Sequence, residues 1–157
     1  MVESAPGKGG LCGSTFLDRR FDRWLRDKFA TSSSWAKDSG YHEDAMSRWI
    51  SEIKVNFDGE TTNVKFQIPA RGFLDNPLLG VRHGKFEISG EEVKQLFDPV
   101  VHDILDMVKW QVAETEKRGR TVKMVLLAGG FGWNPYLQRK IKALVGDHII
   151  VKRMDNW

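Results

Sequence analysis

The residues best suited to chemistry follow one apolar run near the C-terminus. The segment MVLLAGGFGWNP places Gly129, Gly130 and Trp133 directly after aliphatic residues and before Asn134-Pro135, which begins a new segment. In α/β proteins, ligands bind beyond the carboxyl ends of strands, where loops lead into helix N-termini. Glycines let a ligand approach the backbone closely, and a helix N-terminus presents free amides and partial positive charge. The spacing is equally typical of a tight strand-to-helix turn without a ligand, because GGFG is not the complete Gly-x-Gly-x-x-Gly motif.

Other kinds of chemistry find little support in the sequence. The four histidines and the single Cys12 are scattered without zinc-ligand spacing, so no metal site is predicted. No nucleophile–base pair is recognisable, so no catalytic residue is predicted. A dinucleotide-binding fold is disfavoured because LLAGGFG comes late in the chain. The acidic residues that follow it, Asp147 and Asp155, do not end a clean second strand of that motif.

The composition is that of an ordinary globular protein. The chain has 157 residues, of which 41% are hydrophobic and 29% charged, enough for one domain or two small lobes. Its 24 basic residues lie among 21 acidic ones without a long basic run, so no nucleic-acid partner is predicted. No apolar run approaches the roughly 20 residues that span a bilayer, so no membrane partner is predicted either. One cysteine and the lack of a signal-like segment predict a cytoplasmic or nuclear location.

Apolar periodicity indicates the elements of the first half. A helix is predicted from Ser14, and a second helix over residues 42–57, separated by a polar linker at 31–40. Alternation predicts a half-buried strand over 61–68 and a partner strand over 85–88. The residues expected to face inward are Leu17, Phe21, Trp24, Leu25 and Phe29 in the first helix, Ala45, Met46, Trp49, Ile50, Ile53 and Phe57 in the second, and Val64, Phe66 and Ile68 in the strand.

The second half reads as a long helical region followed by a strand–helix–strand unit. Ser89 and Glu92 form a capping box before an apolar period, and Asp98-Pro99 predicts two helices, 90–97 and 99–117, that meet at a bend. Residues 121–128 predict a strand buried on both faces, and 148–153 a parallel neighbour. Asn134, Pro135 and Gly146 delimit the helix between them. The fold class is therefore α/β, with an α+β part and a βαβ layer.

Three segments resemble, in the right order, the ATPase domain of seventy-kilodalton heat-shock chaperones, which belong to the actin-like (sugar kinase/heat-shock/actin) superfamily. VLLAGGFGWNPYLQRKI resembles the adenosine motif of that superfamily. GGLCGSTFLDRRF, residues 9–21, is similar to the segment that opens the outer subdomain of lobe II in divergent, fungal-type members. FEISGEEVKQLFDPVVHDIL, residues 86–105, resembles the family's strand, long helix and Asp-Pro bend.

The resemblance implies a partial actin-like ATPase fold. Residues 1–13 would be a flexible lead-in, 14–97 the outer subdomain of lobe II and 98–157 part of its inner subdomain. The ligand implied is ATP or ADP, with Mg²⁺ in full-length relatives. The family's two phosphate-binding hairpins have no counterpart in this sequence. The chain is therefore expected to contribute only the adenosine side of a nucleotide site, to be inactive as an ATPase by itself, and to bind nucleotide weakly or not at all.

The same resemblance assigns five candidate cofactor-binding residues. Gly13 would lie near the ribose, and Lys54 would replace the family's adenosine-contacting lysine. Gly129 and Gly130 would pack under the base, and Trp133 would stack on it in place of an arginine. Two alternatives stay open, namely that Lys54 is a solvated helix lysine and that Trp133 is a core or interface aromatic.

A second function class is a non-catalytic module for protein interaction or self-association, derived from the same fold. The predicted inner sheet lacks the neighbouring strands of the family. Unpaired strand edges and exposed apolar surface invite a protein partner or another copy of the chain.

Overall fold

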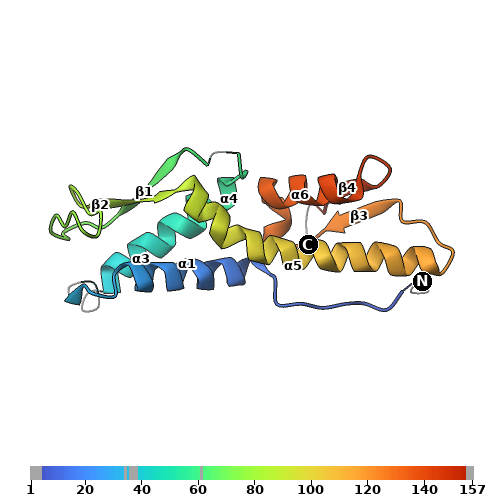
Figure 1. Ribbon diagram of the computed structural model, residues 1–157, viewed down its shortest axis with the longest axis horizontal. Coiled ribbons are helices and arrows are strands. Elements are labelled where there is room, and N and C mark those ends of the chain that lie inside the picture. The colour runs from blue at the N-terminus through green and yellow to red at the C-terminus, as the bar shows by residue number, and fades with distance from the viewer. Residues whose placement is uncertain (1–4, 34, 36–38, 61, 155–157) are drawn as a thin grey trace.

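The computed structural model describes residues 5–33, 35, 39–60 and 62–154, which form a mixed α/β fold. Figure 1 shows a two-stranded sheet towards each end of an elongated molecule, with one long helix running between them. In chain order the elements are α1 (Ser14–Lys28), α3 (Ser39–Arg48), η1 (Trp49–Ile53), α4 (Lys54–Asn56), β1 (Lys65–Pro69), β2 (Lys85–Ser89), α5 (Gly90–Lys117), β3 (Met124–Leu127), η2 (Gly130–Trp133), α6 (Pro135–Val145) and β4 (Ile150–Arg153).

Helix α1 begins at the predicted residue and buries the predicted face. The residues Leu17, Phe21, Leu25 and Phe29 are buried. Trp24 is partly buried and packs against the same core. Phe21 stacks on Trp49, with ring centroids 4.4 Å apart. This aromatic contact joins α1 to the second helix.

The predicted second helix is confirmed but contains a wider turn. It runs without a break through α3, the π-helical segment η1 and α4. Ala45, Trp49, Ile53 and Phe57 are buried at intervals of four residues. In an α-helix of 3.6 residues per turn this interval would drift around the axis, and the wider π turn offsets part of that drift. Ile50 was expected to face inward, but it rotates outward and is 45% exposed.

The predicted polar linker at 31–40 contributes to the core. Trp35 is buried and stacks on Phe29, with ring centroids 3.9 Å apart. Residues 34 and 36–38 of this linker lie outside the described residues. The prediction missed Trp35 because a single aromatic among serines has no periodicity, whereas its burial depends on neighbours from distant segments.

The two predicted partner strands, β1 and β2, pair antiparallel, with Phe66 opposite Ile88 and Ile68 opposite Phe86. Phe86, Ile68 and Ile88 are buried, and Phe66 is partly buried. Val64 was expected on this face, but it precedes the strand and is exposed. The connection between them is a long loop, residues 70–84.

Helix α5 starts at the predicted capping box. The Ser89 hydroxyl accepts from the Glu92 amide at 3.2 Å, and the Ser89 amide donates to the Glu92 carboxylate at 2.8 Å. The prediction of two helices is wrong, because α5 continues through Pro99 as one helix. Figure 1 shows that α5 instead changes direction within its first half. A proline removes one hydrogen bond and crowds one carbonyl, which bends a well-packed helix without ending it.

The C-terminal unit has the predicted parallel pairing, with Met124 opposite Ile150 and Leu127 opposite Arg153. The prediction that strand β3 is buried on both faces is wrong. Val125 and Leu127 pack against the core, but Met124 and Leu126 are exposed. Within the described part of the chain this sheet has two strands, and Ile150, which is paired with Met124, is exposed as well.

Residues 5–13 have no helix or strand and lie beside the C-terminal half of α5. Lys8 Nζ lies 5.5 Å from the centre of the Trp110 ring, and Gly10 packs against Met107. The expected boundary between residues 97 and 98 falls inside α5, which spans both parts of one continuous core. No described helix combines the length and apolarity needed to cross a membrane.

Candidate functional site

One pocket brings together three segments that are far apart in sequence. It lies between the start of α1, the η1–α4 helix and the turn η2, and has a volume of about 200 Å³. Three of the five predicted site residues meet here, since Lys54 of the second helix and Gly130 and Trp133 of the turn all line the pocket. The full lining consists of Ser14, Ile50, Lys54, Val55, Gly130, Phe131, Trp133 and Asn134.

The glycine turn has the backbone geometry that its sequence requires. Gly129 has φ +80°, a conformation that residues with side chains rarely adopt. Its carbonyl accepts from the Gly132 amide at 3.0 Å, which closes the turn into η2. At Gly130 an added Cβ would meet nothing within 4 Å, so the backbone there borders open space.

Asn134 connects this turn to the second helix through hydrogen bonds of its side chain. Its side-chain oxygen accepts from the Leu137 amide at 3.0 Å, which caps α6 as predicted. Its amide nitrogen also donates to the carbonyls of Lys54 at 2.9 Å and Phe57 at 3.2 Å. The residue is 4% exposed, so these bonds lie in a water-poor environment. One side chain therefore sets the distance between α4 and the start of α6.

Lys54 is held by a carboxylate. Its ammonium lies 2.7 Å from Asp18 Oδ1 of α1, and the indole nitrogen of Trp49 donates to the same oxygen at 3.0 Å. The Lys54 side chain is only 12% exposed. The reading of Lys54 as a solvated helix lysine is therefore wrong, and its charge is largely balanced by Asp18.

Trp133 is not a core residue, because 49% of it is exposed. The guanidinium of Arg153 lies over its ring, 4.1 Å from the centroid. Such a cation–π contact favours one orientation of the indole. A flat ligand would have to stack on the opposite face or displace Arg153.

Gly13 and Gly129 border the pocket without lining it. Gly13 precedes α1 next to Ser14, and its carbonyl accepts from the Phe16 amide at 2.9 Å. Gly129 directly precedes Gly130. Both positions are consistent with a backbone role.

Sequence reasoning missed Ser14, Ile50, Val55 and Phe131 as lining residues. Ile50 and Val55 are 45% and 48% exposed on the second helix. Apolar periodicity predicts which residues are buried, but it does not predict which exposed residues border a pocket. The Asn134-Pro135 helix start was visible in the sequence, whereas the two additional hydrogen bonds of Asn134 were not.

The lining defines what the pocket can hold. Ile50, Val55, Phe131 and Trp133 supply apolar surface, and Ser14 and Asn134 supply polar atoms. Pockets for drug-sized ligands have roughly 300–1,000 Å³, so this one has room for a single flat ring system. Among the described residues, no group of three or more histidine, cysteine or acidic side chains is arranged to hold a metal ion.

Cys12, near the start of α1, has the character of a structural thiol. Burial, followed by the carboxylate of Asp103, raises the pKa of Cys12. The thiolate is the reactive form, so this shift makes Cys12 a poor nucleophile at neutral pH.

Comparison with known protein families finds no family that matches this chain, and comparison with curated protein sequences finds no similar sequence.

Proposed function

We propose that this chain binds the adenosine part of an adenine nucleotide in the pocket formed by α1, the η1–α4 helix and η2. In line with the resemblance to heat-shock, actin-like ATPases, the chain would be a lobe II segment of a chaperone-type ATP-binding protein. That protein would act in the cytoplasm or nucleus. The base would stack on Trp133, and the ribose would lie towards Gly13 and Ser14.

The observation that carries this proposal is the convergence of separate segments. The resemblance assigns Gly13, Lys54, Gly129, Gly130 and Trp133 from sequence alone. Lys54, Gly130 and Trp133 line one pocket, and Gly13 adjoins its Ser14. A surface hollow unrelated to the resemblance would not be expected to be lined by these residues.

The affinity should be low. Stacking on an aromatic residue contributes roughly 1–3 kcal/mol per base, and the Lys54 charge is already balanced by Asp18. A dissociation constant on the order of 1 mM corresponds to about 4 kcal/mol. None of the assigned residues would contact Mg²⁺ or a terminal phosphate, so we expect no ATP turnover by this chain alone.

The test is a titration with adenosine while amide chemical shifts are recorded. Shifts should concentrate at Ser14, residues 50–55 and residues 129–134. Trp133→Ala should weaken binding by about fivefold or more, in line with the loss of one stacking contact. Cytidine offers a smaller stacking surface and should bind less tightly.

Gly130→Gln gives a second variant, because Gly130 lines the pocket and a Cβ added there would enter open space. It should abolish the adenosine response. Gly9→Gln is the matched control, since Gly9 also has nothing within 4 Å of an added Cβ and lies outside the pocket. Unchanged adenosine binding by Gly130→Gln would refute the proposed site.

A second candidate function is protein association through the outer face of the β3–β4 sheet. Met124, Leu126 and Ile150 are 42%, 53% and 57% exposed there. Met124 and Ile150 are direct neighbours in the parallel register. Exposed apolar residues on this two-stranded sheet favour a protein partner or a second copy of the chain. Sedimentation over a range of concentrations tests self-association, which Leu126→Lys should abolish. If the chain is a monomer at all concentrations, self-association is excluded, and only a different protein could bind this face of the sheet.

A further inference from the structure

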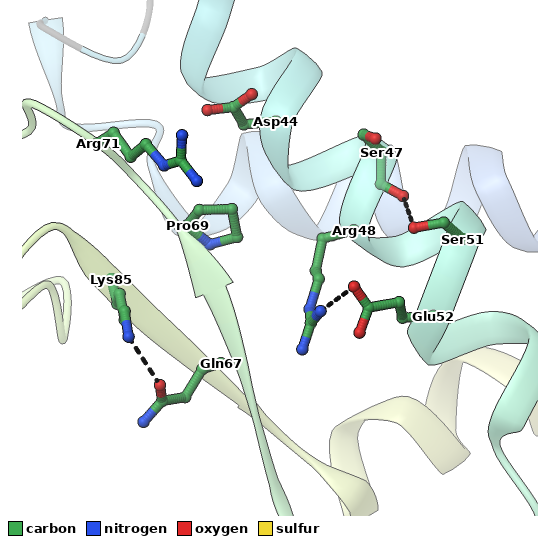
Figure 2. Close-up of a pocket in the computed structure, with 9 residues that line it drawn as sticks. All are labelled: Asp44, Ser47, Arg48, Ser51, Glu52, Gln67, Pro69, Arg71 and Lys85. Carbon is green, nitrogen blue, oxygen red and sulfur yellow. Dashed lines mark hydrogen bonds and ion pairs between the residues drawn. The ribbon is translucent and has the colours of Figure 1, made fainter.

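A second hollow lies between α3 and the β1–β2 sheet (Figure 2). Its volume is about 430 Å³, roughly twice that of the pocket beside Trp133. Nearly every side chain around it is polar or charged. The lining consists of Asp44, Ser47, Arg48, Ser51, Glu52, Gln67, Pro69, Arg71 and Lys85.

The hollow exists because two polar faces oppose each other. Residues 44, 47, 48 and 51 follow helical spacing on the side of the helix that carries no core residue. Along β1, Phe66 and Ile68 turn towards the core, so Gln67 and Pro69 turn towards this gap. Polar side chains do not close the space by apolar packing, and room for a solute remains.

Three basic groups surround the gap. Figure 2 shows Arg48 extending from the helix, Arg71 from the chain just after β1, and Lys85 from β2. Arg48 forms an ion pair with Glu52. Lys85 donates to the neutral Gln67 side chain at 3.3 Å. Among the described residues, no carboxylate forms an ion pair with Arg71 or Lys85.

The positive charge continues along the outer face of the sheet. Gln67 and Lys85 also line an adjoining hollow of about 640 Å³, together with Lys65, Pro77, Gly80, Arg82, His83 and Glu87. Lys65 and Glu87 pair at 3.0 Å, while Arg82 has no carboxylate partner among the described residues. The two hollows together hold five Lys or Arg and three acidic side chains. They therefore account for two of the chain's three net positive charges.

We propose that the hollow between α3 and the β1–β2 sheet binds a small ligand that carries phosphate groups. Arg71 supplies a planar guanidinium, which matches the oxygens of a phosphate, and Lys85 supplies a mobile point charge. A phosphate monoester or diphosphate carries the two or more negative charges that these unpaired cations can balance. The hydroxyl of Ser47 offers a further donor at the rim, whereas that of Ser51 already donates to the Ser47 carbonyl at 2.8 Å.

This site is independent of the proposed adenosine pocket, which is lined by different residues. Inorganic pyrophosphate has no base to stack, and adenosine has no phosphate. Separate titrations with these two probes therefore distinguish the two proposals, and either can fail without the other.

The experiment titrates the full chain with inorganic pyrophosphate at an ionic strength of about 0.1 M while amide chemical shifts are recorded. Saturable shifts are expected at residues 44–52, 67–71 and 85. Arg71→Gln and Lys85→Gln should each weaken binding by about fivefold or more, because each removes a charge-assisted hydrogen bond. Both side chains are exposed, and thermal denaturation should show wild-type stability for both variants.

Lys109→Gln is the matched control, because it removes one exposed positive charge from α5, outside both hollows. It should leave pyrophosphate binding within a factor of about two, since exposed charges beyond a Debye length of roughly 10 Å are largely screened. Equal weakening by Lys109→Gln and Lys85→Gln would overturn the proposal, because it would show attraction to net charge alone. Pyrophosphate shifts confined to residues 129–134, or the absence of any saturable shift, would overturn it as well.

Discussion

Asn134→Asp should destabilise the fold strongly, although the change replaces one good N-cap residue with another. Asparagine and aspartate are about equally favourable at an N-cap. The introduced carboxylate would still accept from the Leu137 amide, but it could not donate to the carbonyls of Lys54 and Phe57. These carbonyls now accept from Asn134 at 2.9 and 3.2 Å within a buried site.

The magnitude follows from the two orphaned carbonyls. Leaving a buried acceptor without its partner costs about 1–3 kcal/mol. Two such losses, together with a carboxylate facing two carbonyl oxygens, give a decrease of at least about 3 kcal/mol in the free energy of unfolding. For a chain of 157 residues, about 2–4 °C of melting temperature corresponds to each kcal/mol, so the midpoint should fall by about 6–12 °C.

Urea unfolding followed by circular dichroism measures this difference, and Asn56→Asp is the matched control. The Asn56 amide also donates to a backbone carbonyl, that of Glu52 at 2.8 Å, but it is exposed. Its replacement should cost less than about 1 kcal/mol. The loss at Asn134 should also shrink as the pH falls towards about 4, because protonation removes the buried charge and restores one donor. If Asn134→Asp unfolds at the wild-type urea concentration, Asn134 is a helix cap only and does not anchor α4.

Two further predictions concern the contacts of Tyr136. Gly59 has φ +75°, and an added Cβ would lie 2.3 Å from the Tyr136 ring, so Gly59→Ala should cost more than about 2 kcal/mol in urea unfolding. Gly130→Ala should change stability by less than about 0.5 kcal/mol because its Cβ would enter open space, and equal midpoints for the two variants would contradict this reasoning. Burial raises the pKa of Asp98, but hydrogen bonds from Lys94 and Tyr136 outweigh it and hold this pKa below its ordinary value. A lowered folded-state pKa stabilises the fold above the unfolded pKa of about 3.9, so the advantage of wild type over Asp98→Asn should be constant near neutral pH and shrink as the pH falls below about 4. An advantage that does not change between pH 7 and acid unfolding would refute this role for Asp98.

Local chemistry explains which elements could be predicted. The capping box of Ser89 and Glu92, and the Asn134-Pro135 start and Gly146 end of α6, satisfy backbone groups within a few residues. Such signals do not depend on the rest of the fold. Helix α1 likewise follows from a regular apolar period, since one of its faces packs against a single core.

The failed predictions depend on features that periodicity and capping signals do not specify. Trp35 is buried because Phe29 and other aromatic rings surround it. Ile50 faces outward because a π turn changes the phase of the second helix. Helix α5 passes through Pro99 because both sides of the bend are packed against the core. Met124 is exposed because it lies on the opposite face of β3 from Val125 and Leu127, which pack against the core.

The sequence by itself determined the glycine turn, the helix that follows it and the parallel pairing of the flanking strands. Only the tertiary structure decided that Lys54 and Trp133 border one pocket, that Asp18 balances the charge of Lys54, and that Arg153 covers one face of Trp133. The sequence separation is 36 residues for the bond from Lys54 to Asp18 and 80 for that from Asn134 to Lys54. Contacts across such separations form when the apolar faces of several helices pack together. No local period or capping signal specifies which polar side chains then meet.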